Sequence, residues 1–275
     1  MNSITVRRRH PLARYVVLLL ALSFLGGTYA LLAPGGDRAD AASASGRLDD
    51  VAEGKALFTA HCASCHGMSG EGSFTAGSAS GPSLIGVGAA AVDFQVSSGR
   101  MPFANPGPQA LRKRPPEWVN ETTIRQLAAY VQSLGGGPVV PAAEAVDPSK
   151  GDPAKGGELF RANCIQCHNF AGAGGALTYG KHAPSLDPAT PTQIYEAMVT
   201  GPQAMPVFND TTITPEQKRD MIAYITSLRT QPDPGGNGLA HIGPVMEGLV
   251  IWTAGLGIVV LAAIWITAKK RQVKQ

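Results

Sequence analysis

The sequence predicts a mainly α-helical protein, in which two similar domains lie in tandem between an N-terminal and a C-terminal transmembrane helix. Three observations support this fold class. A Cys-x-x-Cys-His pattern occurs at residues 62–66 and again at 164–168, 102 positions later. The segments 127–134 (LAAYVQSL) and 221–228 (MIAYITSL) share four of their eight residues. An uncharged apolar stretch lies near each end of the chain.

The first predicted element is a transmembrane helix within residues 1–36. Residues 15–33 are uncharged and follow a basic cluster at 7–9. A cleavable signal peptide is the alternative, because a basic start, an apolar core and small residues at 41–44 also describe one. The apolar run is longer than a usual signal core, which favours a retained helix. Either outcome exports residues 40–240.

The two repeated domains are predicted at residues 48–134 and 154–229. Each should contain an opening helix, the Cys-x-x-Cys-His pattern, a long loop and a closing helix. The segments 135–153 and 230–246 are rich in Gly and Pro and are interpreted as linkers. Two domains on such flexible joints would be able to shift relative to each other.

Glycines in the opening helices predict how each repeat packs. Gly54 and Gly156 lie in these helices, where glycine costs about 1 kcal/mol relative to alanine. A close crossing against Tyr130 or Tyr224 of the closing helix would account for that cost.

The closing helices carry start signals. Asn120 is a candidate N-cap for the first. Residues 214–217 (TPEQ) offer an N-cap threonine, a proline at the first helical position and a capping-box glutamine for the second.

The last predicted elements are a transmembrane helix at 247–268 and a basic cytoplasmic tail at 269–275. Positive charges flank both apolar stretches on their outer sequence ends. By the positive-inside rule both termini lie in the cytoplasm and the domains between them lie outside. We therefore expect a multi-pass protein of the cell membrane with both domains on its extracytoplasmic side.

The composition of the chain limits which partners and which kind of domain interior it can have. The net charge of +3 is too small to suggest a nucleic-acid partner. Gly (33) and Pro (21) are abundant, while aromatic residues make up only 6%. This profile fits small, loop-rich domains that fill their interiors with a large prosthetic group.

Cys-x-x-Cys-His is the attachment signature of c-type haem, in which two thiols bind the haem vinyl groups and the histidine binds the iron. The two patterns use every cysteine of the chain. Two covalently bound haem c groups are therefore predicted, attached through Cys62, Cys65, Cys164 and Cys167.

Three other uses of the cysteines are less consistent with the pattern. Paired zinc ligands usually lie roughly 15–20 residues apart, and zinc gives no reason for a histidine after each pair. Disulfides within Cys-x-x-Cys would constrain the unfolded chain little. A thioredoxin-like redox motif needs a βαβ context, whereas these flanks are predicted to be helical.

Both repeats resemble the class I cytochrome c family, whose pattern is Gly-x-x-x-Phe, Cys-x-x-Cys-His, a Pro-containing segment, Met-Pro and a closing helix. By that resemblance His66 and His168 are the proximal iron ligands, and Met101 and Met205 the distal ones. Met/His ligation raises the reduction potential and leaves no open coordination site. No catalytic residue is predicted, since a closed site favours electron transfer.

Other side chains compete for the distal role. A buried methionine more often fills a core than binds a metal. Met198 and Met221 lie at apolar positions of predicted helices, and Met68 follows the first histidine too closely. His182 is the main rival of Met205, although its place beside Pro184 suits the wall of the loop.

The loop after the Met-Pro pair is about ten residues longer in the first repeat than in the second. The extra residues fall around 105–118 and include Arg112, Lys113 and Arg114. They form either a solvated loop or a docking surface for an acidic or membrane-bound redox partner, because charge accelerates encounter.

The order of the elements along the whole chain resembles the dihaem cytochrome c subunit of the actinobacterial cytochrome bcc complex. The resemblance implies an electron relay from a Rieske iron–sulfur subunit to an aa3-type oxidase, beside a cytochrome b subunit. The chain would be the electron-transfer subunit of a menaquinol or ubiquinol:cytochrome c reductase, with the quinol chemistry on cytochrome b.

Three alternative functions remain. The dihaem subunit of a cbb3-type oxidase usually has a membrane helix only before its haem domains. A dihaem enzyme, such as a peroxidase, needs an open or unusual distal ligand. A cytochrome subunit that anchors a periplasmic dehydrogenase also fits, and co-purification with a b-type cytochrome would distinguish it.

Overall fold

The structure, a computed structural model, describes residues 12–32, 41–73, 81–103, 109–230 and 244–272. The basic cluster at 7–9, most of the segment 230–246 and residues 273–275 lie outside the described residues. The chain divides into two units, Met1–Arg47 and Leu48–Gln275.

The first unit contains helix α2, Ala13–Leu32, where the sequence predicts the first membrane helix. Its strongly apolar part, Arg14–Thr28, is shorter than a full membrane span. The side chains from Tyr15 to Gly27 are exposed. The described part of this unit is thus helical, but its apolar length supports a membrane span less clearly than the C-terminal helix does.

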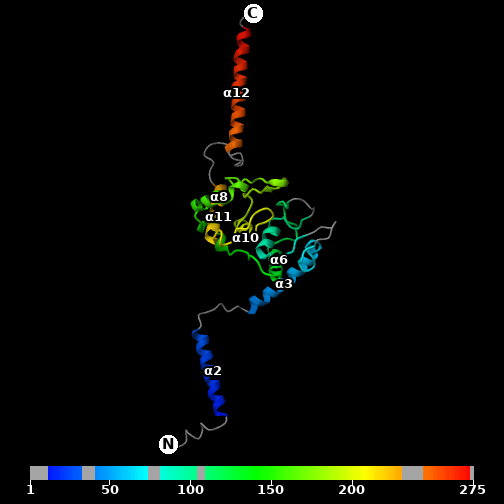
Figure 1. Cartoon of the computed structure of the whole chain (residues 1–275), viewed down its shortest axis with the longest axis vertical. Helices are drawn as coiled ribbons and strands as arrows, with labels where there is room; N and C mark the ends of the chain where they lie inside the picture. The colour runs from blue at the N-terminus through cyan, green and yellow to red at the C-terminus, as the bar shows by residue number, and fades with distance from the viewer. Residues whose placement is uncertain (1–11, 33–40, 74–80, 104–108, 231–243, 273–275) are drawn as a thin grey trace. The chain divides into compact units, whose positions relative to one another are not determined.

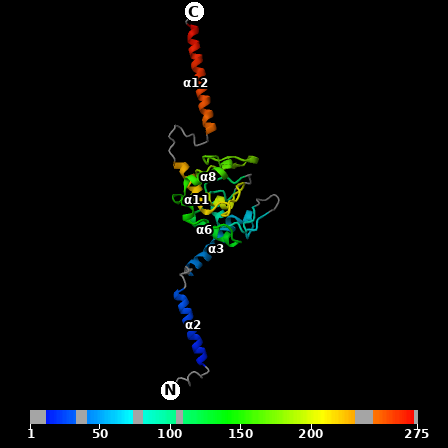
Figure 2. The same ribbon diagram turned by 60° about the vertical axis from the view of Figure 1, so that its left-hand side comes forward.

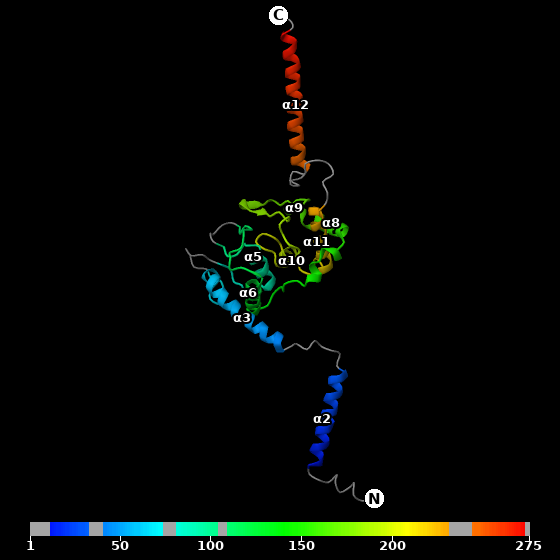
Figure 3. The same cartoon turned by 180° about the vertical axis from the view of Figure 1, so that it is seen from behind.

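The described residues of the first repeat form four helices. They are α3 (Ala41–His61), which begins in the first unit, α4 (Ala63–His66), α5 (Ala89–Ser97) and α6 (Glu121–Ser133). Figure 3 shows α5 and α6 beside each other. Their core consists of Phe58, Ala63, Leu127, Tyr130 and Val131.

The second repeat has the same plan. Its helices are α8 (Pro153–Asn163), α9 (Ile165–His168), η2 (Thr178–Gly180), α10 (Pro191–Thr200) and α11 (Pro215–Thr230). Two short helices precede it in the segment 135–153, α7 (Ala143–Val146) and η1 (Pro148–Lys150). Two short antiparallel strands, β1 (Gly175–Ala176) and β2 (His182–Ala183), pair Gly175 with Ala183. Helices α8 and α11 pack side by side (Figures 1 and 2) over a core that includes Phe160, Ile194, Met221 and Ile222.

The close helix crossings predicted from the glycines are confirmed. A Cβ atom on Gly54 would lie 2.0 Å from the Gln126 carbonyl oxygen and 2.9 Å from Cβ of Tyr130. A Cβ on Gly156 would lie 1.9 Å from the Asp220 carbonyl oxygen. Only glycine therefore permits these approaches. Tyr224 packs against the next residue of α8, Gly157, rather than against Gly156.

The predicted caps are also confirmed. The Asn120 side chain accepts hydrogen bonds from Thr122 N–H and Thr123 N–H at the start of α6. At the start of α11, Thr214 N–H donates to the Gln217 amide oxygen, and Gln217 N–H donates to the Thr214 hydroxyl. These bonds satisfy backbone donors that the helix itself leaves free.

The segment 135–153 differs from the predicted flexible joint. It forms α7 and η1, and Val146 is only 8% exposed within the core of the second repeat. The Pro138 carbonyl accepts a 3.0 Å hydrogen bond from Ala90 N–H, and Asp152 N–H donates to the Asp220 carboxylate at 2.8 Å. The bond from Ala90 ties this Gly- and Pro-rich segment to the first repeat. The burial of Val146 and the bond to Asp220 tie it to the second repeat.

Helix α12, Pro244–Gln272, contains the second predicted span. Within it, Gly248–Ala268 has a mean hydropathy of 2.5 and no buried side chain. At 21 residues and about 1.5 Å per residue, this stretch is long and apolar enough to cross a bilayer.

Candidate functional site

The first candidate site is built on one helical turn after α3. The Cys62 carbonyl accepts hydrogen bonds from Cys65 N–H at 3.1 Å and from His66 N–H at 3.0 Å, which brings both cysteines and the histidine together. The His66 ring nitrogen Nδ1 lies 2.8 Å from the Pro82 carbonyl oxygen. Because a carbonyl only accepts, Nδ1 is the donor in this bond, which leaves Nε2 as the ring nitrogen that can bind a metal.

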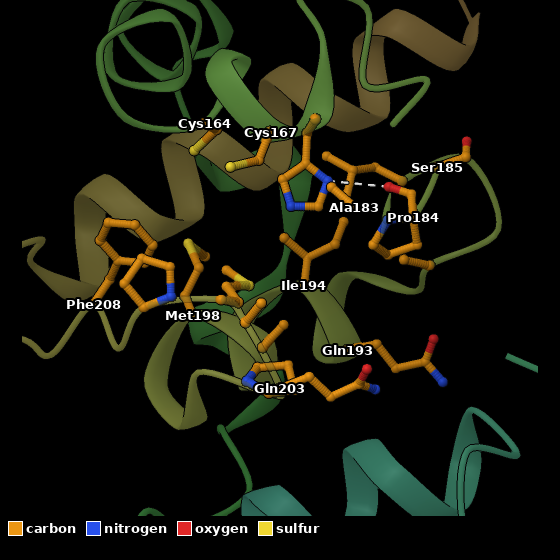
Figure 4. Close-up of a pocket in the computed structure, with 18 of the residues that line it drawn as sticks. Cys164, Cys167, Ala183, Pro184, Ser185, Gln193, Ile194, Met198, Gln203 and Phe208 are labelled. Carbon is orange, nitrogen blue, oxygen red and sulfur yellow. Dashed lines mark hydrogen bonds between the residues drawn. The ribbon is translucent and has the colours of Figure 1, made fainter. Parts of the chain in front are cut away.

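The second site repeats this arrangement. The Cys164 carbonyl accepts from Cys167 N–H and His168 N–H, at 3.2 and 2.9 Å. His168 Nδ1 lies 3.0 Å from the Pro184 carbonyl, the bond dashed in Figure 4. Burial lowers the pKa of His168, partly opposed by the bond to Pro184. The imidazole is therefore neutral at pH 7, which is the form that binds iron.

The four cysteines are unpaired in the structure. Burial raises the pKa of the Cys62 and Cys164 thiols to about 11, and the neighbouring Cys65 and Cys167 add to the effect. Among the described residues, no three His, Cys, Asp or Glu side chains gather as a zinc site requires.

A cavity of about 260 Å³ lies beside the second site. Its lining includes Cys164, Cys167 and His168 on one side and the sulfur-bearing Met205 from the loop after α10. Most of the remaining wall is apolar, with Phe160, Leu186, Ile194, Phe208 and Ile225. Two thiols, an imidazole with a free Nε2 and a thioether around an apolar cavity fit a haem c group.

Local backbone geometry holds Met205 at the cavity. Gly201 ends α10 with φ +58°, and a Cβ there would lie 2.7 Å from Val207 Cγ2 and 2.9 Å from the Met205 carbonyl oxygen. Phe208 N–H then donates to the Met198 carbonyl at 2.7 Å, which closes the loop. The sequence Gly-Pro-Gln-Ala-Met-Pro thus turns the methionine back over the pocket.

Met101 occupies the equivalent position in the first repeat. It is half-buried, and its N–H donates to the Gln95 carbonyl at 2.9 Å, which ties it to the end of α5. Residues 104–108 of its loop lie outside the described residues.

The other candidate distal ligands differ in their positions. Met198 and Met221 belong to the core of the second repeat and also line the cavity, whereas Met68 is 62% exposed. His182 lies on β2, is exposed, and lines the cavity together with Met205.

The long loop of the first repeat contacts the second repeat, which neither of its sequence-based interpretations anticipates. Gln109 pairs with the backbone of His182, donating at 2.6 Å and accepting at 3.0 Å. Gln203 donates to the Ala110 carbonyl at 2.9 Å, and Arg112 donates to the Gln193 amide oxygen. Arg112, Lys113 and Arg114 are all exposed. The extra length of this loop was the only sequence signal for the contact.

Helices of the two repeats also meet directly. Gln193 on α10 donates to the Ser97 hydroxyl on α5 at 2.9 Å. Four first-repeat residues line the cavity of the second repeat, namely Phe94, Arg100, Gln109 and Arg112. The second site is therefore completed by residues of the first repeat.

Comparisons with known proteins agree with this architecture. The family model described as cytochrome c matches residues 51–135. The family model described as cytochrome c oxidase, cbb3-type, subunit III matches residues 151–225. Each matches one repeat, so the chain contains two cytochrome c domains, which supports haem c binding.

Relatives match nearly the whole chain. The cytochrome bc1 complex cytochrome c subunit of Corynebacterium efficiens is 43% identical over 95% of this chain and 90% of the relative. That of Corynebacterium diphtheriae is 41% identical over 98% and 99%, and that of Mycobacterium tuberculosis is 44% identical over 96% and 93%. At this identity over almost the full length, the chain belongs to the family of cytochrome bc1 complex cytochrome c subunits.

Proposed function

We propose that this chain is the dihaem electron-transfer subunit of a cytochrome bc1-type complex. It would relay electrons from the Rieske iron–sulfur subunit to an aa3-type oxidase, beside cytochrome b. The observation that carries the proposal is the repeated donor set, in which a Cys-x-x-Cys-His turn bonds its histidine to a proline carbonyl in both domains. The near full-length match to bc1 complex subunits supports the choice of complex.

In this proposal four thiols attach two haem groups, namely those of Cys62, Cys65, Cys164 and Cys167. His66 and His168 are the proximal iron ligands. Their Nδ1–H bonds to Pro82 and Pro184 orient each ring and make Nε2 a better donor. A bound haem c supplies one-electron transfer between its ferric and ferrous states.

Met101 and Met205 are the proposed distal ligands. Met205 lies in the cavity wall, and the turn at Gly201 holds its loop in place. A thioether on each iron closes the coordination site, so the side chains have an orienting and insulating role rather than a catalytic one. Apolar residues such as Ile194 and Phe208 keep water away from the site.

The proposed domains are residues 48–134 and 154–229, joined through the packed segment 135–153. The proposed membrane anchor is the part of α12 at residues 247–268. The basic tail, residues 269–275, would lie in the cytoplasm and both domains outside. Residues 1–36 would be a second membrane helix. An anchored carrier with two redox centres suits transfer between membrane complexes without a diffusing cytochrome.

Purification in mild detergent tests this function. We expect the tagged chain to bring down a cytochrome b, a Rieske protein and an aa3-type oxidase. A pyridine haemochrome assay should count two haem c groups per chain. Isolation with the core subunits of a cbb3-type oxidase, or with a periplasmic dehydrogenase and no cytochrome b, would contradict the proposal in favour of those alternatives.

A further inference from the structure

Arg100 is a buried cation at the boundary between the two domains. Its side chain is only 7% exposed, and it lines the cavity of the second domain. Its Nη1 atom is shielded from solvent and has no hydrogen-bond partner among the described residues. One face of the guanidinium lies 4.8 Å from the centre of the Phe94 ring. A buried positive charge is costly unless an anion or several acceptors compensate it.

A second guanidinium lies nearby. Arg112 lines the same cavity, and its positive charge acts on Arg100. Neither arginine belongs to any of the four ion pairs found among the described residues. Two like charges that face one cavity without a carboxylate favour the binding of an anion.

Two amide side chains, those of Gln193 and Gln203, lie on one side of the cavity. Gln193 accepts from Arg112 while donating to Ser97, which places the Arg112 guanidinium on that side as well. Figure 4 shows Gln193 and Gln203 across the cavity from the sulfurs of Cys164 and Cys167. The cavity thus has a thiol edge and, opposite to it, an edge rich in amides and cations.

A haem has the matching polarity, because its two vinyl groups and its two propionate carboxylates lie on opposite edges of the ring. When the vinyl edge faces Cys164 and Cys167, the propionates face the amide and cation edge. A guanidinium matches a carboxylate with paired N–H donors.

We propose that Arg100 and Arg112 of the first domain bind the propionates of the haem held in the second domain. This inference rests on the proposed haem of the second domain. The long loop of the first domain then has a defined role: it carries Arg112 to the partner domain's cofactor, while Gln109 holds the loop on β2. Haem binding in the second domain and the contact between the domains would stabilise each other.

The reduction potential of the second haem tests the inference. The full chain in its detergent-purified complex is titrated optically, and the second-haem component is recognised as the one that changes in Met205→Leu. Removing a positive charge beside a haem favours the more positive, ferric iron. We expect Arg112→Gln to lower the reduction equilibrium constant of the second haem about tenfold, or about 59 mV for one electron. The first-haem component should stay unchanged.

Arg112 and Arg114 are both exposed residues of this loop, but only Arg112 lines the cavity. Arg114→Gln is therefore the matched control, because it removes the same charge from the same loop away from the cavity. Arg112→Lys should lower the reduction potential of the second haem less than Arg112→Gln does, since lysine keeps the charge but not the paired N–H donors. Arg100→Gln provides a second variant, expected to act in the same direction on the second haem.

Three outcomes would overturn the inference. One is an unchanged second-haem potential in both Arg112→Gln and Arg100→Gln, with two haems still bound. Another is an equal shift of the second-haem potential in Arg114→Gln, which would indicate a general charge effect. The third is a wild-type potential that varies with inorganic phosphate at constant ionic strength, which would assign the arginines to a free anion. Absence of haem from the second domain of the wild type would instead contradict the proposed function itself.

Discussion

At the scale of single residues, chemistry depends on which atoms remain available. His66 and His168 each donate a hydrogen bond from Nδ1–H to a proline carbonyl sixteen residues later, which leaves Nε2 available to bind a metal. Met198 and Met205 show the same principle among thioethers, since both line one cavity but only Met205 lies on the loop that the turn at Gly201 folds back. The residue type alone does not separate them.

Replacing Met205 by leucine should open the second haem. We expect loss of its methionine–iron charge-transfer band, binding of carbon monoxide to the reduced protein, and a reduction equilibrium constant lowered by more than about tenfold. Optical spectroscopy and redox titration measure these changes. Met198→Leu is the matched control and should retain all three wild-type properties. If Met205→Leu kept the band, His182 or another side chain would have to be the ligand.

Glu196 predicts a dependence of stability on pH. It is fully buried on α10, and neither carboxyl oxygen has a hydrogen-bond partner among the described residues. Burial, and secondarily the charge of Asp93, raises its pKa from 4.5 to about 9. The folded state therefore holds this proton more tightly than the unfolded state, and stability is lost as pH rises from about 4.5 towards 9. One such group can lower the free energy of unfolding by at most about 1.4 kcal/mol per pH unit.

The variant Glu196→Gln keeps the shape but removes the ionisation. We expect its melting temperature to exceed that of the wild type at pH 8 and to fall less between pH 5 and pH 8. Glu158→Gln, at an exposed position of α8, should follow the wild-type curve. Parallel pH profiles for wild type and Glu196→Gln would contradict this account.

At the scale of elements, each domain depends on one close crossing between its opening and closing helices. Gly54 and Gly156 permit the crossings, and the pairs Phe58–Tyr130 and Phe160–Tyr224 pack beside them with ring centroids 5.2 and 5.4 Å apart. The repeated geometry places the Cys-x-x-Cys-His turn at the same end of the crossing in both domains.

Replacing Gly156 by alanine should separate α8 from α11. Its Cβ would lie 1.9 Å from the Asp220 carbonyl oxygen, which a backbone shift must relieve. We expect the free energy of unfolding to fall by about 1–3 kcal/mol, the usual cost of overpacking. Thermal unfolding of the haem-loaded protein measures the loss. Glu158→Ala, on the exposed side of the same helix, should change stability little, and an equal loss there would refute the crossing as the cause.

At the scale of the whole second unit, the two cytochrome domains form a shared polar interface. In the long loop of the first domain, Gln109 bonds to β2 and Ala110 bonds to Gln203 in the loop after α10. Gln193 on α10 bonds to Ser97 on α5. Such contacts fix the orientation of the two candidate haem sites within one chain.

Gln109→Ala should loosen this interface locally. The His182 amide N–H donates to the Gln109 side chain, so its loss should speed exchange of that amide about fivefold, for a hydrogen bond worth about 1 kcal/mol. Hydrogen–deuterium exchange of the peptide that contains β2 measures this rate. Gln203→Ala, which removes a different bond of the interface, should leave the rate unchanged. An unaltered rate in Gln109→Ala would contradict the described contact.

Sequence patterns were enough to predict the fold class, the repeat, the helix caps, the close glycine crossings and the C-terminal apolar span. These features depend on local spacing or on short motifs, and the structure shows the caps, the crossings and the apolar helix. The candidate haem residues could be named for the same reason, because attachment and ligation require fixed residue types at fixed spacing.

The way in which the two domains meet could not be predicted from sequence patterns. The Gly- and Pro-rich segment 135–153 packs because Val146 finds a distant core, which composition does not reveal. Arg100 and Arg112 reach the second cavity from another domain, and the environment of Glu196 depends on a helix about a hundred residues away in the sequence. Such long-range contacts leave no periodic pattern, since each depends on surfaces that become neighbours only after both domains fold.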